Sequence, residues 1–267
     1  MTRVEALLRK ELLELRAHPG IFVPALLTGG LALALPFIVA IGIPIVTGDA
    51  LASSPDDGMV SDIWSAEPSW RMLGPVGTVQ AWLFRQFLLL LTLSPVAAAM
   101  SVAASSIVGE KQGRTLEPLL ATPLTTFELL TAKTLSALLP ALALQLVMSA
   151  LYVAGIAVTA APGVARTLLT PEPLLIVLVV GPLAALAALQ LAVCMSSRAN
   201  DPRSAQQMGA LVILPLAAAM VLQLMGAVDL GARELLAMAA LLAGVNVVLA
   251  NVSIALFDRE SILTRWR

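Results

Sequence analysis

The amino-acid sequence predicts an all-α membrane protein with six transmembrane helices, and three observations lead to this fold class. Of the 267 residues, 59% are hydrophobic and 12% are charged, and the mean hydropathy is +0.92. A soluble domain has about 25% charged residues, so this chain has too few charges to cover a water-soluble core of its size. The ionisable residues leave six long charge-free intervals, each sufficient for the roughly 20 apolar residues that cross a bilayer. Two of these intervals, 86–109 and 173–197, are apolar on every face, which excludes the alternating strands of a β-barrel.

The charge-free intervals place the transmembrane helices along a single domain that comprises residues 1–267. A charge at the bilayer centre costs about 2.5–3.5 kcal/mol on insertion scales, so the spans are expected between the charged residues that bound each interval. The expected spans are approximately 21–46, 84–108, 134–160, 173–196, 206–228 and 234–257.

A surface helix is expected before the first span, over residues 3–16. Most of its charges lie opposite an apolar stripe, which is typical of an amphipathic helix at a membrane interface. His18-Pro19-Gly20 predicts a break between this helix and the first span. The apolar stripe consists of Val4, Leu7, Leu8, Leu12 and Leu15.

A cleaved signal peptide is the alternative interpretation of the N-terminal region. Ala50-Leu51-Ala52 resembles a cleavage site. The apolar run before it is about twice the 7–15 residues of a signal peptide's apolar region, and the acids Glu5, Glu11 and Glu14 dilute the leading positive charge. We therefore expect the first apolar segment to remain as a membrane span.

The distribution of lysine and arginine predicts the orientation. Six spans place both termini on one side, and that side carries 12 of the 16 Lys and Arg residues, against 3 on the other. The positive-inside rule then puts both termini in the cytoplasm of a multi-pass protein of the cytoplasmic (inner) membrane. The remaining residue, Arg85, is expected near the outer end of the second span, where its long side chain reaches the headgroups beside Trp82.

The longest outer segment, about 48–80, is acidic and carries Trp64 and Trp70. We interpret it as a solvated loop with interfacial tryptophans rather than as a mouth that collects cations. Its carboxylates are too widely spaced to predict a metal site. The single Cys194 excludes both a disulfide framework and a cysteine-built metal site.

The cytoplasmic segment 109–133 encodes two short helices. Thr115 can cap the first, Pro118 is tolerated in its first turn, and Pro123 ends it. Thr125 and Glu128 have the spacing of a capping box, which begins the helix that continues into the third span. The product is a compact unit tied to two membrane helices, which suits it to transmit force from a soluble partner. The apolar ridge of its first helix consists of Leu116, Leu119 and Leu120.

This segment resembles the signature of ABC-2 (type V exporter) permeases, the membrane subunits of a class of ABC transporters. Two positions depart from that pattern, because Arg114 and Ala132 stand where many members have glycine. The layout of a surface helix followed by six spans is also similar to the family, as is the C-terminal stretch 257–263. The matching residues, in order, are Glu110, Thr115, Leu116, Glu117, Leu119, Leu120, Thr122, Pro123, Glu128 and Lys133.

The resemblance implies a half-transporter. Two permease subunits, expected to be a homodimer, would form one pathway, and the segment 114–123 would be a coupling helix that docks into a separate ATPase subunit. This chain has no Gly-x-x-x-x-Gly-Lys-Ser/Thr loop, so we expect no catalytic residues, cofactor or metal of its own, with ATP and Mg²⁺ held by the partner. The implied partner-binding residues are Glu110, Arg114, Thr115, Leu116, Glu117, Leu119, Leu120, Thr122 and Pro123.

Polar residues within the spans are uncharged amides and hydroxyls. Gln145, Gln190, Gln223 and Asn246 are candidates for a substrate pathway, although hydrogen bonding between helices is the more common role of such side chains. Small residues in steps of four predict close helix packing in the second and fourth spans. Ten methionines and Cys194 are better explained by packing than by copper binding. The small-residue series are Ala97-Ser101-Ser105 and Ala184-Ala188-Ala192-Ser196.

Two other classes of function stay open. A secondary transporter or channel would work without an ATPase, but it usually needs ionisable residues near the middle of the membrane or broken helices in symmetric halves. An intramembrane enzyme needs a nucleophile, base or metal, and the sequence offers neither a His-Glu-x-x-His motif nor paired acids within a span. Nothing in the sequence identifies the transported substrate.

Overall fold

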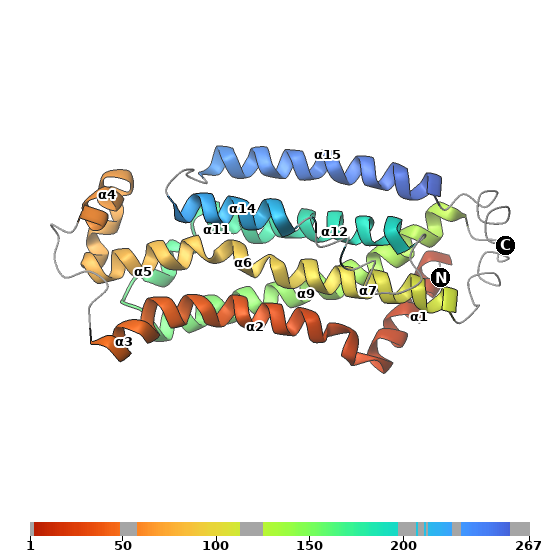
Figure 1. Ribbon diagram of the computed structural model, residues 1–267, viewed down its shortest axis with the longest axis horizontal. Helices are drawn as coiled ribbons and strands as arrows, with labels where there is room; N and C mark the ends of the chain where they lie inside the picture. Colours follow the sequence, from red (N-terminus) through yellow and green to blue (C-terminus); the bar gives the residue numbers. More distant parts are fainter. Residues whose placement is uncertain are drawn as a thin grey trace.

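The computed structural model describes residues 3–48, 58–112, 125–196, 207, 211, 213–225 and 231–256. These residues form a bundle of long helices and contain no strand. Five helices within them are long and apolar enough to cross a membrane. Figure 1 shows that α1 (Arg3–Ala17) and the last turn of α15 (Ala232–Leu256) lie at one end of the bundle, whereas α4 (Gly58–Ala66) lies at the other.

The first span begins after a break in the chain. The helix α1 ends at Ala17, and a 3-10 turn starts at Pro19, as the His18-Pro19-Gly20 sequence predicts. The span then contains a π-helical turn, in which the Ile43 N–H donates to the carbonyl of Ile38, five residues back. Pro44 follows directly and has no N–H to restore the α-helical ladder. The elements are η1 (Pro19–Phe22), α2 (Val23–Phe37), η2 (Ile38–Gly42) and α3 (Ile43–Thr47).

The second span is the central rod of the bundle and is longer than expected (Figure 1). Its helical path runs from Pro68 to Ser106, and 89% of its most apolar 18-residue stretch is buried, against 22% for the first span. Residues 68–83, which the sequence assigned mostly to the outer loop, are therefore helical. The reason is that Arg85 has ion-pair partners, so the helix continues on both sides of this charge. Its elements are η3 (Pro68–Leu73), α5 (Gly74–Gln86), α6 (Leu88–Leu91) and α7 (Leu93–Gln112).

The third span starts at the predicted capping box. The Thr125 hydroxyl accepts a hydrogen bond from the Glu128 N–H at 3.1 Å, and the Glu128 carboxylate accepts one from the Thr125 N–H at 2.8 Å. This confirms the capping-box prediction and fixes the start of α9 (Thr126–Thr159), whose 34 residues form the longest helix described. Two short helices, α10 (Val164–Thr167) and α11 (Pro171–Leu175), then reverse the chain.

The fourth span contains a second π-helical turn, η4 (Ile176–Val180), before α12 (Gly181–Ser196). After Ser196 the expected fifth span, 206–228, is described chiefly over α14 (Ile213–Leu224), a shorter apolar helix than a full crossing needs. Figure 1 shows α12 ending at the α1 end of the bundle and α15 beginning at the α4 end. The count of six spans remains a prediction, since the flanks of α14 lie outside the described residues.

The core combines a small-residue seam with an aromatic cluster. The central α7 packs along α12, where Ala184, Ala188 and Ala192 are fully buried, in agreement with the predicted packing face. Nearer the α4 end, the buried Tyr152 donates a hydrogen bond to the Phe84 carbonyl at 2.9 Å. Its ring also stacks edge-on against Phe84 and Phe37.

Candidate functional site

The expected coupling segment lies largely outside the described residues. Glu110 belongs to the backbone of α7, and nothing is described of residues 113–124. Both ends of the segment are defined, because α7 ends at Gln112 and the capping box starts α9 at Thr126. The partner-binding residues that stay predictions are Arg114, Thr115, Leu116, Glu117, Leu119, Leu120, Thr122 and Pro123.

A buried ionic cluster joins α7 and α9, the helices on either side of the segment 113–124, to α1. The Lys133 ammonium lies 3.3 Å from one carboxylate oxygen of Glu11 and donates to the Ser106 hydroxyl at 2.8 Å. Ser106 in turn donates to the other Glu11 oxygen at 2.9 Å. The Glu11 and Lys133 side chains are each only 5% exposed. The three side chains come from α1, α7 and α9, so the cluster joins α1 to both helices that flank the segment 113–124.

The position of Glu11 on α1 explains how its carboxylate becomes buried. Leu7, Glu11 and Leu15 follow one another at four-residue spacing and are all buried, so they form one stripe of α1. This stripe packs on α9, where Ala132 is fully buried beside Lys133. The exposed side of the helix also contributes, because Lys10 lies 3.6 Å from Glu11 and 3.1 Å from Glu14.

Sequence reasoning did not identify this cluster. It treated Glu11 as one of the acids that dilute the N-terminal charge, and it matched Lys133 to the family signature without a structural role. A signal was present, since Glu11 interrupts an apolar stripe between Leu7 and Leu15. A carboxylate in that position must find a cation when the stripe is buried.

A second ionic cluster lies at the opposite end of the bundle. Arg85 on α5 lies 3.3 Å from Glu67 and 3.7 Å from Glu172, and its guanidinium sits 5.8 Å from the centre of a Trp70 ring. The sequence predicted that Arg85 reaches the headgroups beside Trp82. The structure instead surrounds it with two carboxylates and an aromatic face. This cluster joins α5, the start of η3 and α11.

Gln145, the first pathway candidate, donates a hydrogen bond to a backbone carbonyl that has no donor within its own helix. In η4 the Gly181 N–H donates to the carbonyl of Ile176, and Pro182 has no N–H, so the Val177 carbonyl has no helical donor. The Gln145 amide donates to this carbonyl at 2.7 Å. A Cβ atom at Gly181 would collide with the same amide. The Gln145 amide therefore joins α9 to the fourth span, whereas its buried carbonyl oxygen has no partner among the described residues.

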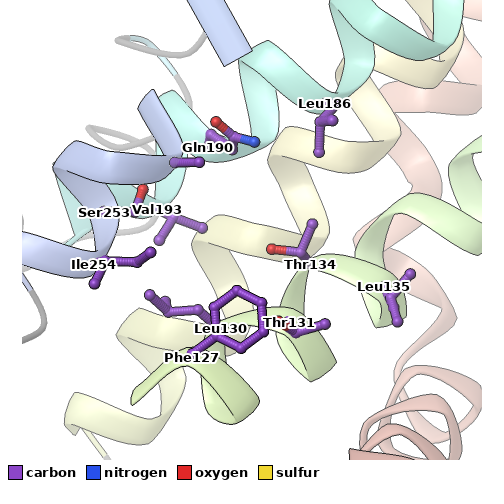
Figure 2. A pocket seen from close by; sticks show the side chains of 11 residues that line it. Phe127, Leu130, Thr131, Thr134, Leu135, Leu186, Gln190, Val193, Ser253 and Ile254 are labelled. Carbon is purple, nitrogen blue, oxygen red and sulfur yellow. The ribbon is translucent and has the colours of Figure 1, made fainter. Parts of the chain in front are cut away.

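The other three pathway candidates lie apart. Asn246 on α15 is buried and donates to the Leu183 carbonyl at 3.0 Å, which ties α15 to α12. Gln223 is buried on α14, and its carbonyl oxygen has no partner among the described residues. Gln190 lines a pocket between α9, α12 and α15 (Figure 2). The structure does not gather the four amides into one pathway.

The side-chain types that bind metals do not gather into clusters of three in the part of the chain that is described. Within these ranges, no three His, Cys, Asp or Glu side chains come together as a metal site requires. Cys194 lies 3.2 Å from the Ser253 hydroxyl, in a contact between α12 and α15.

Comparison with known proteins identifies the family. A family model described as "ABC-2 family transporter protein" matches residues 75–246, which is more than half of the chain. No curated protein matches the sequence. The matched region begins in α5, includes the segment 113–124 and ends within α15. The chain thus belongs to the ABC-2 family of transporter proteins and is a multi-pass membrane permease.

Proposed function

We propose that this chain is the membrane-spanning subunit of an ATP-driven exporter. A separate ATP-binding subunit would move the segment 114–123 and so switch the pathway between inward and outward access. The observation that carries the proposal is the buried cluster of Glu11, Ser106 and Lys133. Because the cluster joins α1, α7 and α9, a displacement of the segment 114–123 would move three helices together and not only the end of one helix.

The proposed assembly follows from this role. Two copies of the chain form one pathway as a homodimer, and each docks its segment 114–123 into an ATPase subunit that supplies ATP and Mg²⁺. Both termini face the cytoplasm, and α1 lies along the inner membrane surface. The charged residues Arg9 and Arg16 on the exposed side of α1 suit contact with lipid headgroups there.

Coupling is tested by variants of the segment itself. The full chain is reconstituted in liposomes with the ATPase with which it co-purifies, and vanadate-sensitive ATP hydrolysis is measured with and without the permease. We expect Thr115→Pro and Leu116→Asp to abolish stimulation of the ATPase while membrane insertion is unchanged. The matched control is Met72→Asp, which places the same charge on an exposed residue of η3 at the far end of the bundle. Normal stimulation by both segment variants, or the absence of any co-purifying ATPase, would contradict the proposal.

Orientation is tested by labelling with a membrane-impermeant maleimide. The single, buried Cys194 is first replaced with alanine to give a cysteine-free chain. Ser65→Cys, at the α4 end, should react in intact cells, whereas Arg114→Cys should react only after permeabilisation. The reverse pattern would place the segment 114–123 on the outside and remove its access to a cytoplasmic ATPase.

A further inference from the structure

A pocket of about 250 Å³ opens on the side of the bundle where α9, α12 and α15 meet. Figure 2 shows side chains of the three helices around one space, with Phe127 and Leu130 from α9, Gln190 and Val193 from α12, and Ser253 and Ile254 from α15. It lies at the α1 end, between the first turns of α9 and the C-terminal parts of α12 and α15. Phe127 is 64% exposed and Ile254 is 40% exposed, so the rim is apolar and open to the surroundings of the bundle.

Three polar groups in the pocket have no partner within the described structure. Gln190, Thr131 and Thr134 form no hydrogen bond there, although all three line the space. This differs from other threonines of the spans, which donate to a carbonyl of their own helix, as Thr28 and Thr159 do. Of these three residues, only the Gln190 carbonyl oxygen is among the fully buried unpartnered atoms.

The groups that remain accessible can all donate a hydrogen bond, and the two hydroxyls can also accept one. They are the amide nitrogen of Gln190 and the hydroxyls of Thr131 and Thr134. None of the lining residues is charged. An occupant should therefore be apolar along most of its buried length and carry an uncharged acceptor. A donor left unpaired in hydrocarbon is costly, so the membrane favours a molecule that brings such an acceptor.

The position of Gln190 along α12 agrees with a lipid as the occupant. Gln190 lies six residues before the end of α12, which is about 9 Å along the helix axis from its cytoplasmic end. With the described end of α12 at the headgroups, as in the proposed orientation, this is the level at which the ester carbonyls of membrane lipids give way to acyl chains. The pocket volume is below the roughly 300–1,000 Å³ typical of sites for whole small molecules, and it suits part of a single chain.

We propose that this pocket binds one acyl chain of an inner-leaflet glycerolipid, whose ester carbonyl accepts hydrogen bonds from Gln190 and from Thr131 or Thr134. The headgroup stays outside, at the level of Phe127. The inference rests on the proposed orientation for the choice of leaflet and for the depth of Gln190, and it does not depend on ATP coupling. A lipid held here would contact α9 beside the start that the capping box defines, and so would lie close to the segment 113–124.

The test compares two lipids that differ only in the acceptor. The full chain is purified from vesicles that contain either a diester phosphatidylglycerol or its diether analogue, which has no ester carbonyl, and retained lipid is counted by native mass spectrometry. We expect the diester to be retained about 3- to 10-fold more strongly, the range for one or two hydrogen bonds. Thr134→Val and Gln190→Leu should reduce diester retention toward that of the diether and leave diether retention unchanged.

Two further variants complete the test. Thr159→Val is the matched control, because it is the same substitution on the same helix at a hydroxyl that already donates to the Gly155 carbonyl at 2.8 Å. It should change neither lipid. Ala250→Leu, which fills the pocket, should release both lipids. Equal retention of diester and diether in the unaltered chain would overturn the proposal. So would an Ala250→Leu variant that keeps both lipids but no longer self-associates, which would assign this face to a second copy of the chain.

Discussion

The two ends of the bundle each carry an ionic cluster, and the clusters differ mainly in burial. At the α1 end, the Glu11 and Lys133 side chains are each 5% exposed. At the α4 end, the side-chain exposures are 18% for Arg85, 44% for Glu67 and 27% for Glu172. Water therefore screens the second cluster and is largely excluded from the first. Similar charge pairs consequently have different energetic roles at the two ends.

The difference also concerns what each cluster holds. The buried cluster joins α1 to the two helices that flank the segment 113–124, whereas the exposed one joins the start of η3 to α5 and α11. Buried charges that pair with one another hold their helices in one geometry, because separating the helices would leave a buried charge unpaired. Hydrated charges can exchange their protein partners for water at little cost in free energy. We infer that the contacts among α1, α7 and α9 are held more rigidly than those between α5 and α11.

The sharpest test of this comparison is Lys133→Met, for which we expect the largest effect. The substitution leaves the Glu11 carboxylate buried without its closest cation, which should lower the free energy of unfolding by about 3–5 kcal/mol. The midpoint of thermal unfolding of the purified protein reports the loss. The double variant Glu11→Met/Lys133→Met should recover most of it because no buried charge remains. A Lys133→Met protein as stable as the unaltered chain would show that the cluster does not stabilise the contacts among the three helices.

An uncharged hydrogen bond between helices should have an intermediate effect on the free energy of unfolding, and Gln145→Leu measures it. Removing the amide leaves the Val177 carbonyl without a donor at the π-helical turn, at a cost of about 1–3 kcal/mol. Thermal unfolding again provides the measurement. Asn251→Leu is the control, because the Asn251 amide donates only to the Val247 carbonyl of its own helix, at 2.7 Å. Equal losses in both variants would mean that the contact between helices adds nothing.

A smaller loss is expected at the start of α9. Thr125→Ala removes the hydroxyl that accepts from the Glu128 N–H and should cost about 1 kcal/mol. Hydrogen exchange should show the effect in the first turn of α9, with the amides around Tyr152 unchanged. Thr125→Ser keeps the hydroxyl and should restore protection. Uniform loss of protection along α9 would indicate that the cap controls the whole helix instead of its first turn.

The smallest effect is expected for Arg85→Met, at most about 1 kcal/mol, since Glu67 and Glu172 are hydrated without it. The informative measurement is its dependence on ionic strength. Added salt should shrink the Arg85→Met difference in thermal unfolding but leave the Lys133→Met difference nearly unchanged. If the two differences responded alike, the contrast in burial between the clusters would have no energetic consequence.

Features that depend on local sequence were predictable, and those that depend on long-range pairing were not. The all-helical class, the break at His18-Pro19-Gly20 and the capping box of Thr125 and Glu128 each follow from a few neighbouring residues, and the structure confirms them. The small-residue face of α12 was predicted for the same reason.

The ionic clusters and the length of the second span required knowledge of the partners. Arg85 was taken as the boundary of an apolar interval because its distant acids, Glu67 and Glu172, were not known to meet there. The pairing of Glu11 with Lys133 crosses 122 positions of the chain, beyond any local pattern. The role of Gln145 depends on the π-helical turn opposite it, which proline spacing alone does not reveal.

The burial of the central rod has a consequence for how the protein is made. The α5–α7 rod is the second span to leave the ribosome, yet its α7 section packs chiefly on α9 and α12, which are synthesised later. Until those helices arrive, the surface of α7 that they cover has lipid or the insertion machinery as its neighbour. Folding in the bilayer thus requires α7 to exchange these first neighbours for protein, so a chain that stops before Gly181 would leave the side of α7 that packs on α12 without its protein neighbour.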